Sequence, residues 1–196
     1  MFLRNFSLRS PDASTSVRLR GARLFRRVAL IAAQLAIVLA WTGATAVRAD
    51  IKAGDTFPNF APAGVVNLAG GELPATGGRV VLVDFWASWC APCKASFPAM
   101  ARLHADYAAR GLVIAAVSID EKPAAATAFW KKMAPPFATL HDRQQNLVKQ
   151  VVVPTMPTSY LVGRDGRVRF VHEGFHGDAT DREIRKEIDA LLAEPK

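Results

Sequence analysis

The two cysteines of this chain, Cys90 and Cys93, are three residues apart, a spacing that suits reversible dithiol–disulfide exchange. They follow an apolar run and open a helical pattern. Cys90 is therefore expected at a helix N-terminus, where unpaired N–H groups and the helix dipole favour a thiolate. The adjacent Lys94 adds positive potential. We predict that Cys90 attacks a partner disulfide and that Cys93 then resolves the mixed disulfide.

A structural disulfide and a metal site are the competing interpretations of this pair. A bridge that closes so short a loop contributes about 2 kcal/mol on the chain-entropy account, against about 4.7 kcal/mol for a 100-residue loop. A zinc site needs two further ligands at short spacing, and the neighbouring sequence offers none, so we expect no metal there. A copper-handling binding module is the alternative function, because Cys90, Cys93 and Met156 are soft ligands that suit Cu(I).

A second metal pattern, His172-Glu173-Gly174-Phe175-His176, matches the H-E-x-x-H signature of zinc proteases. That signature requires a helix that places both histidines on one face. The segment follows a predicted strand and contains a glycine. We therefore expect no zinc site and treat both histidines as surface residues.

Asp84 interrupts the apolar run 79–87, which is otherwise typical of a buried central strand. Burying a carboxyl group is costly unless the group has a partner or a task. Asp84 precedes Cys90 by six residues, at the end of the strand that leads into the cysteine pair. We predict that it shuttles a proton to or from Cys93. The alternative is an acid that is simply hydrogen-bonded to backbone near the strand terminus.

Strand and helix patterns alternate along the remaining chain and end in a hairpin. An Asp-Gly pair at 165–166 is a strong hairpin signal. Thr180 and Glu183 can form a capping box at the start of the last helix. This order implies an α/β fold, a three-layer sandwich with a mixed β-sheet. The expected strands are 79–87, 112–119, 159–162 and 168–172, and the expected helices are 94–109, 124–133, 144–150 and 181–193.

Residues 1–49 differ in composition from the rest of the chain. They contain eight arginines and a single acid, Asp12, and so carry most of the net charge of +8. Residues 50–196 are close to neutral and offer no electrostatic footprint for nucleic acid. We therefore divide the chain into a targeting segment, 1–49, and one globular domain, 50–196.

The targeting segment has the order of an export signal. A basic start, an apolar run over 28–41 and small residues ending at Ala49 predict cleavage after Ala49. The main alternative is an uncleaved N-terminal membrane anchor, since about 20 residues can span a bilayer. In both cases the domain 50–196 is exported. A twin-arginine signal and a mitochondrial transit peptide are two further interpretations.

The cysteine pair lies in the segment 83–94, VDFWASWCAPCK, which resembles the thioredoxin signature. The opening 54–60, GDTFPNF, and the exported context resemble the TlpA/ResA-like thiol-disulfide reductases of the bacterial periplasm. The similarity covers residues 54–193. It implies a thioredoxin-like fold, a reversible disulfide between Cys90 and Cys93, and no cofactor.

The same resemblance implies a cis-proline that faces the motif. Pro157 is the matching position, preferred over Pro154 because a strand follows it directly. We expect the backbone at Met156 and Pro157 to pair with an extended substrate segment, and Trp89 to pack beside the motif at the surface. The chain departs from many cytochrome c maturation reductases, which carry Glu where it has Ser96.

These observations predict an exported thiol-disulfide oxidoreductase of the protein-disulfide reductase type. Its expected location is the periplasm, either soluble or anchored to the inner membrane with the domain facing the periplasm. Its expected partners are disulfide-containing protein substrates and a membrane electron donor. The alternative among thiol-disulfide oxidoreductases is an oxidase, which would use the same two cysteines.

Overall fold

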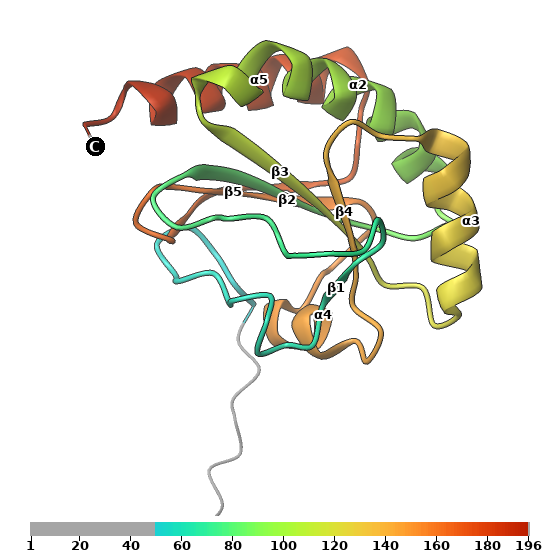
Figure 1. Cartoon of the computed structure of the whole chain (residues 1–196). Coiled ribbons are helices and arrows are strands. Elements are labelled where there is room, and N and C mark those ends of the chain that lie inside the picture. The colour runs from blue at the N-terminus through green and yellow to red at the C-terminus, as the bar shows by residue number, and fades with distance from the viewer. Residues whose placement is uncertain (1–49, 196) are drawn as a thin grey trace, which may run out of the picture. The chain divides into compact units, whose positions relative to one another are not determined.

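A mixed six-stranded sheet forms the central layer of this computed structural model, which describes residues 50–195 (Figure 1). The strand order is β1-β4-β3-β2-β5-β6. The strands are β1 (Val66–Asn67), β2 (Val80–Trp86), β3 (Leu112–Ser118), β4 (Ala138–His141), β5 (Thr158–Val162) and β6 (Val168–Glu173). The helices are α2 (Ala91–Tyr107), followed by the 3-10 turn η1 (Ala108–Arg110), then α3 (Pro123–Met133), α4 (Asn146–Val151) and α5 (Asp178–Ala193).

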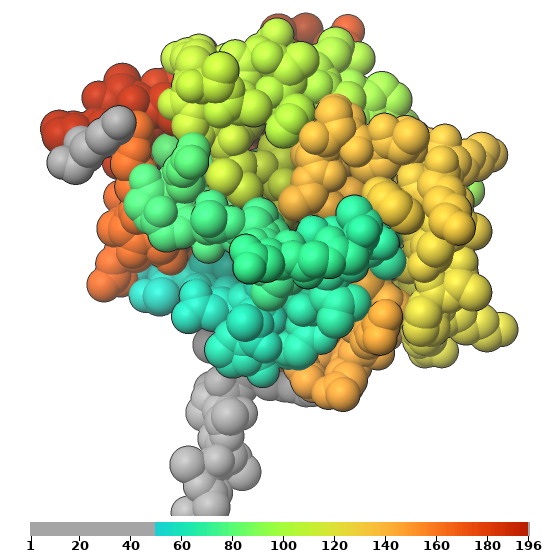
Figure 2. Space-filling model, viewed as in Figure 1, coloured from blue at the N-terminus to red at the C-terminus, as the bar shows by residue number. Residues whose placement is uncertain are grey.

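Helices cover both faces of this sheet, which confirms the predicted three-layer α/β sandwich (Figure 1). Apolar side chains of α2, α3 and α5 pack on one face. Side chains of α4 and of the segment 57–65 pack on the other face. Figure 2 shows this segment, in cyan and green, beside the orange chain that holds α4, and the Asn146 amide donates a hydrogen bond to the Ala63 carbonyl. Each face of the sheet therefore has its own apolar core.

The central strand β2 explains why the run 79–87 is so apolar. β2 pairs with β3 in parallel and with β5 antiparallel, and every one of its side chains is buried. Successive side chains point to opposite faces of a strand. Leu82 and Trp86 lie in the core under α2 and α5, so Asp84 between them faces the same side. The carboxyl therefore points toward the helix that follows the cysteines.

The structure adds two strands that the sequence does not predict, the two-residue β1 and β4. β4 has only four residues, and it follows the Pro135-Pro136 pair that ends the pattern of α3. It forms because β3 offers a parallel edge, on which Ala115 pairs with Ala138. Four residues carry too little hydrophobic periodicity to be recognised without that edge.

The last helix begins earlier than predicted. α5 starts at Asp178 with Gly177 as its N-cap, so the capping box proposed for Thr180 and Glu183 is wrong. The Thr180 hydroxyl instead accepts a hydrogen bond from the His176 N–H at 3.0 Å. This start places Asp181 in the first turn of the helix.

Residues 1–49, with the predicted targeting segment, lie outside the described residues. In residues 50–195, none of the helices has the length and apolar character needed to cross a membrane.

Phe97 holds α2 to the sheet through an aromatic cluster. Its ring centroid lies 5.3 Å from that of Trp86 and 5.0 Å from that of Phe129. We predict that Phe97→Ala lowers the free energy of unfolding by about 3–5 kcal/mol, because it leaves a cavity in a packed core. Urea unfolding should show a smaller loss for Phe97→Leu. Equal, small losses for both variants would contradict this role of the ring.

Candidate active site

Cys90 and Cys93 lie where β2 passes into α2, and they are joined by a disulfide. Cys90 is the N-cap residue of α2, which confirms its predicted place at a helix N-terminus. Its Sγ accepts a hydrogen bond from the Cys93 N–H at 3.2 Å. Cys90 is 4% exposed and Cys93 is fully buried. A partner can therefore approach the pair only from the side of Cys90.

Trp89 stands beside this approach. It is 67% exposed, and it is the one large apolar side chain that is exposed in the described part of the chain. Two open hollows lie nearby, and Ser88, the residue before Trp89, lines both. One of about 440 Å³ includes Lys94 and Phe129 in its lining, and one of about 300 Å³ is lined by Trp89 and Asp120 among others. The surface around Cys90 thus combines an exposed aromatic ring with hollows into which a polypeptide segment could fit.

Asp120 positions the loop that carries Trp89 and Cys90, and the sequence analysis did not identify it. The N–H and the hydroxyl of Ser88 both donate to its carboxylate, at 3.0 and 2.7 Å. Ser118 donates a third hydrogen bond at 2.8 Å. Its place directly after a buried parallel strand was an available signal, because side chains at the ends of such strands often line functional sites.

The Asp84 carboxyl is buried, and only one of its two oxygens has a hydrogen-bond partner among the described residues. Its carboxyl is 1% exposed, and Oδ1 accepts a hydrogen bond from the Ser159 hydroxyl at 2.6 Å. Oδ2 has no hydrogen-bond partner among residues 50–195. Burial raises the pKa of Asp84 from 3.8 to about 7, and the Ser159 hydrogen bond partly opposes that rise. The hydrogen-bond partner of Asp84 is thus a side-chain hydroxyl on the neighbouring strand β5. The alternative interpretation expected a hydrogen bond to the backbone.

The peptide bond between Met156 and Pro157 is cis, at the position that the resemblance to the family implied. Pro154, the competing candidate, is not cis. Thr158 pairs with Phe85 across the two strands, so Pro157 lies next to the end of β2 where the motif begins. Pro157 is buried and Met156 is partly exposed. The fold therefore brings this loop to the same edge of the sheet as the cysteines.

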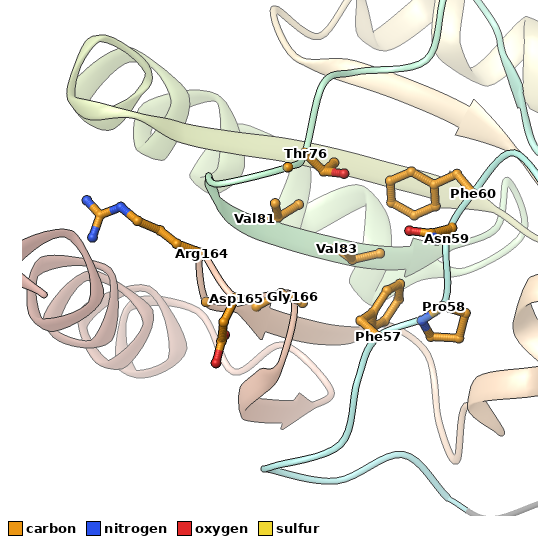
Figure 3. Close-up of a pocket in the computed structure, with 13 residues that line it drawn as sticks. Phe57, Pro58, Asn59, Phe60, Thr76, Val81, Val83, Arg164, Asp165 and Gly166 are labelled. Carbon is orange, nitrogen blue, oxygen red and sulfur yellow. The ribbon is translucent and has the colours of Figure 1, made fainter. Parts of the chain in front are cut away.

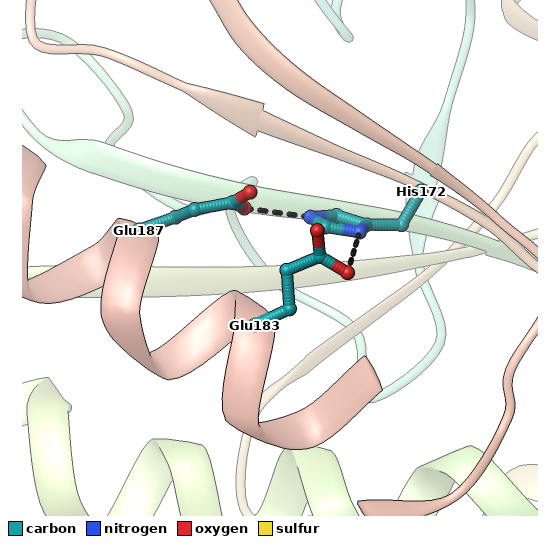
Figure 4. A group of neighbouring side chains, drawn as sticks. All are labelled: His172, Glu183 and Glu187. Carbon is teal, nitrogen blue, oxygen red and sulfur yellow. Dashed lines mark hydrogen bonds and ion pairs between the residues drawn. The ribbon is translucent and has the colours of Figure 1, made fainter. Parts of the chain in front are cut away.

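The histidines of the H-E-x-x-H pattern are not on a helix, because His172 lies in β6 and His176 follows that strand. The expectation that both lie at the surface is wrong for His172, whose side chain is only 10% exposed. It packs between Glu183 and Glu187 of α5 (Figure 4). The sequence missed this because strand and helix meet only in the fold.

The three side chains are close enough to hold a metal ion, with their ligand atoms within 4.8 Å of one another. His172 Nε2 lies 2.6 Å from a Glu187 oxygen, and Nδ1 lies 3.9 Å from a Glu183 oxygen. Both ring nitrogens thus already face carboxylates. Direct contacts between the ring and the two carboxylates account for this arrangement without a metal ion.

A separate cavity of about 220 Å³ lies on the other face of the sheet (Figure 3). Phe57, Phe60, Val81 and Val83 form much of its apolar lining. Arg164 extends from its rim toward α5, where its guanidinium donates to the Leu191, Leu192 and Glu194 carbonyls. Neither cysteine nor Asp84 lines this cavity.

The comparisons with known proteins agree with this geometry. Residues 52–188 match the Redoxin family. The chain is 32% identical over 152 residues to the thiol-disulfide oxidoreductase ResA of Bacillus subtilis (strain 168), covering 74% of this chain and 82% of that protein. This chain belongs to the TlpA/ResA-like thiol-disulfide reductases.

A second relative and a solved structure are matched over a larger share of their own length. ResA of Geobacillus kaustophilus (strain HTA426) is 27% identical over 173 residues, which covers 86% of this chain and 96% of that protein. A Chlorobium tepidum structure assigned as the thiol:disulfide interchange protein DsbE is 34% identical, with a TM-score of 0.67, and covers 74% of this chain and 100% of that one. The thioredoxin-like fold predicted from the sequence is confirmed.

The raised pKa of Asp84 predicts a specific dependence of stability on pH. Between about pH 4 and pH 7 the native state holds a proton on Asp84 that the unfolded state has released. The corresponding stability is complete below about pH 4 and is lost as the pH rises through about 7, a loss of up to about 4 kcal/mol at 1.36 kcal/mol per pKa unit.

We therefore expect Asp84→Asn to gain stability relative to the wild type as the pH rises from 5 to 8. Urea unfolding of both proteins at several pH values measures this difference. The matched control is Asp178→Asn, which changes an exposed acid in the first turn of α5. Its free energy of unfolding should change with pH as that of the wild type does. A difference between wild type and Asp84→Asn that does not change with pH would contradict the raised pKa.

Proposed function

We propose that this protein is an exported enzyme that reduces protein disulfides by dithiol exchange at Cys90 and Cys93. Its class, a thiol-disulfide oxidoreductase, follows from its family. The observation that carries the proposal is the cysteine pair at the N-terminus of α2, with a protonatable carboxyl buried beneath that helix. This arrangement supplies a nucleophile, a resolving thiol and a proton acceptor in one place.

The reaction begins at Cys90. Its thiolate attacks one sulfur of the substrate disulfide, a mixed disulfide forms, and the other substrate sulfur leaves as a thiolate that takes a proton. The helix N-terminus and the Cys93 N–H favour negative charge on Cys90 Sγ. Trp89, Met156 and Pro157 are proposed to contact the substrate segment during this step.

Cys93 then completes the exchange. Asp84 as a carboxylate takes the proton of the Cys93 thiol, and the resulting thiolate attacks Cys90 Sγ. The Cys90–Cys93 disulfide forms, and the second substrate sulfur leaves as a thiol after protonation. Two electrons have passed to the substrate, so a dithiol donor must reduce the enzyme before the next turnover.

The direction and the location of the reaction complete the proposal. Pro92 before Cys93 and the family resemblance favour reduction of substrates, with electrons supplied by a membrane donor. The composition of residues 1–49 supports export to the periplasm, whether that segment is cleaved or anchors the domain. Disulfides persist in that compartment, so a reductase finds its substrates there.

Reduction of insulin by a dithiol, measured with and without the protein, tests the activity. We expect a clear acceleration by the wild type and none by Cys90→Ser. A Cu(I) titration of the reduced protein in parallel tests the copper-handling alternative. Tight stoichiometric Cu(I) binding without any acceleration of insulin reduction would refute the proposed reductase.

The two cysteines should differ in reactivity. We predict that alkylation of the reduced protein at pH 7 labels Cys90 well before Cys93, because Cys93 is fully buried and Cys90 is at the helix N-terminus. Mass spectrometry of timed samples measures both rates, and the urea-unfolded protein, in which the rates should converge, is the control. Equal rates in the native protein, or faster labelling of Cys93, would reverse the assigned roles.

Asp84→Asn should slow disulfide turnover by about tenfold or more, since general acid–base groups contribute about 10²–10⁴-fold. The amide keeps an acceptor for the Ser159 hydroxyl but cannot exchange a proton. Steady-state reduction of a protein disulfide measures the effect. Unchanged turnover in a variant that folds normally would leave Asp84 with a structural role only.

A further inference from the structure

A small cavity connects Asp84 with the first turn of α5. It lies between β2, β5, α2 and α5, and its volume of about 10 Å³ is that of one water-sized probe. Two of its lining residues are acids, Asp84 and Asp181. Asp84 Oδ2 and Asp181 Oδ1 are buried and have no hydrogen-bond partner among the residues that the structure describes. Buried polar atoms without a partner are rare in native proteins.

Asp84 needs a route for its proton. Its carboxyl is buried and must release a proton after each turnover if it accepts one from Cys93. Oδ1 accepts the hydrogen bond of the Ser159 hydroxyl, so Oδ2, which has no partner among the described residues, is the oxygen available for transfer. The cavity is also lined by Ser96, whose hydroxyl donates to the Cys93 carbonyl at 2.9 Å. The cavity thus reaches from Asp84 to the turn of α2 that carries Cys93.

The two carboxylate oxygens of Asp181 have different surroundings. Asp181 lines the cavity and its Oδ1 is buried without a partner among the described residues, while Oδ2 accepts a hydrogen bond from Arg185 Nε at 2.8 Å. The Asp181 side chain is 13% exposed, whereas Asp84 is 1% exposed. Arg185 continues to the exposed Asp106 at the surface. This carboxyl therefore joins the cavity to solvent.

We propose that Asp181 is a positioning residue for Asp84 and that one water molecule in the cavity links their free oxygens. The proton that Asp84 takes from Cys93 passes to this water, the water gives a proton to Asp181, and Asp181 releases it to solvent. No electrons move in these steps, and each carboxylate is regenerated. The inference rests on the proposed proton-accepting role of Asp84.

A purely structural role explains only half of the geometry of Asp181. An acid in the first turn of a helix is favoured by the helix dipole, and the pair with Arg185 at i, i+4 adds to this. Both effects involve the backbone of α5 and Oδ2. They give no reason for Oδ1 to be buried without a partner among the described residues, on a side chain that lines the same cavity as a second carboxyl. Among the cavity-lining residues, from every element packed there, Asp84 and Asp181 are the titratable ones.

The test compares Asp181→Asn with Asp178→Asn, which removes the same charge from the same helical turn at an exposed position. We expect Asp181→Asn to lower kcat for reduction of a protein disulfide by about threefold or more and to change its pH profile, because general acid–base steps are limited by proton transfer. Asp178→Asn should leave both unchanged. Asp181→Glu, which keeps a carboxyl, should restore part of the rate.

Double variants separate a relay from a structural effect. If Asp181 acts through Asp84, then Asp181→Asn causes no further slowing when combined with Asp84→Asn. Equal slowing by Asp181→Asn in the wild-type and Asp84→Asn backgrounds would overturn the inference, as would a rate equal to that of Asp178→Asn. If Asp181→Asn does not show the native circular dichroism spectrum, Asp181→Glu and Asp181→Gln take its place in the same comparison of single and double variants.

The single variant Asp84→Asn separates the role of Asp84 from the relay through Asp181. If it turns over as fast as the wild type, the proposed role of Asp84 fails and the relay fails with it. If it is slow while Asp181→Asn is normal, only the relay fails.

Discussion

The buried carboxyl of Asp84 is the constraint on which the rest of this structure depends. A central strand with every side chain buried would be more stable with an apolar residue there, since desolvation of an acid is costly. The strand carries the acid because one hydroxyl, from Ser159, and a nearly closed cavity hold it in a form that can keep or lose a proton near neutral pH. Because burial raises the pKa of this acid to about 7, its charged form lowers the stability of the native state above neutral pH.

The surrounding elements bring the cysteine pair to the end of the strand that carries Asp84. β2 ends at Trp86, the loop is fixed by the hydrogen bonds from Ser88 to Asp120, and α2 begins with Cys90 as its N-cap. The antiparallel register of β5 brings Pro157 to the same edge. Two independent cores, one on each face of the sheet, hold these strand ends rigidly. The proposed exchange at Cys90 thus takes place at the end of the strand that carries the proposed proton acceptor.

The sequence predicted the parts of this arrangement that rest on local patterns. The apolar run of β2, the cysteine spacing at a helix start and the Asp-Gly hairpin each carry their signal within a few residues. It failed where pairing partners are distant in the chain. β4 needs the edge of β3, His172 is buried only because α5 packs over β6, and Asp181 enters the site only because α5 begins at Asp178. Three-dimensional proximity, which no short pattern encodes, decides these cases.

A direct titration of the Asp84 carboxyl tests the central claim. The carboxyl carbon of Asp84 can be followed by NMR in the oxidised protein from pH 3 to pH 10 and assigned with Asp84→Asn. The account predicts a midpoint at about 7, far above the ordinary value of 3.8, because burial penalises the charged form. A midpoint near 4 would mean that Asp84 is fully ionised at neutral pH and available only as a fixed charge, which would contradict its role in proton exchange.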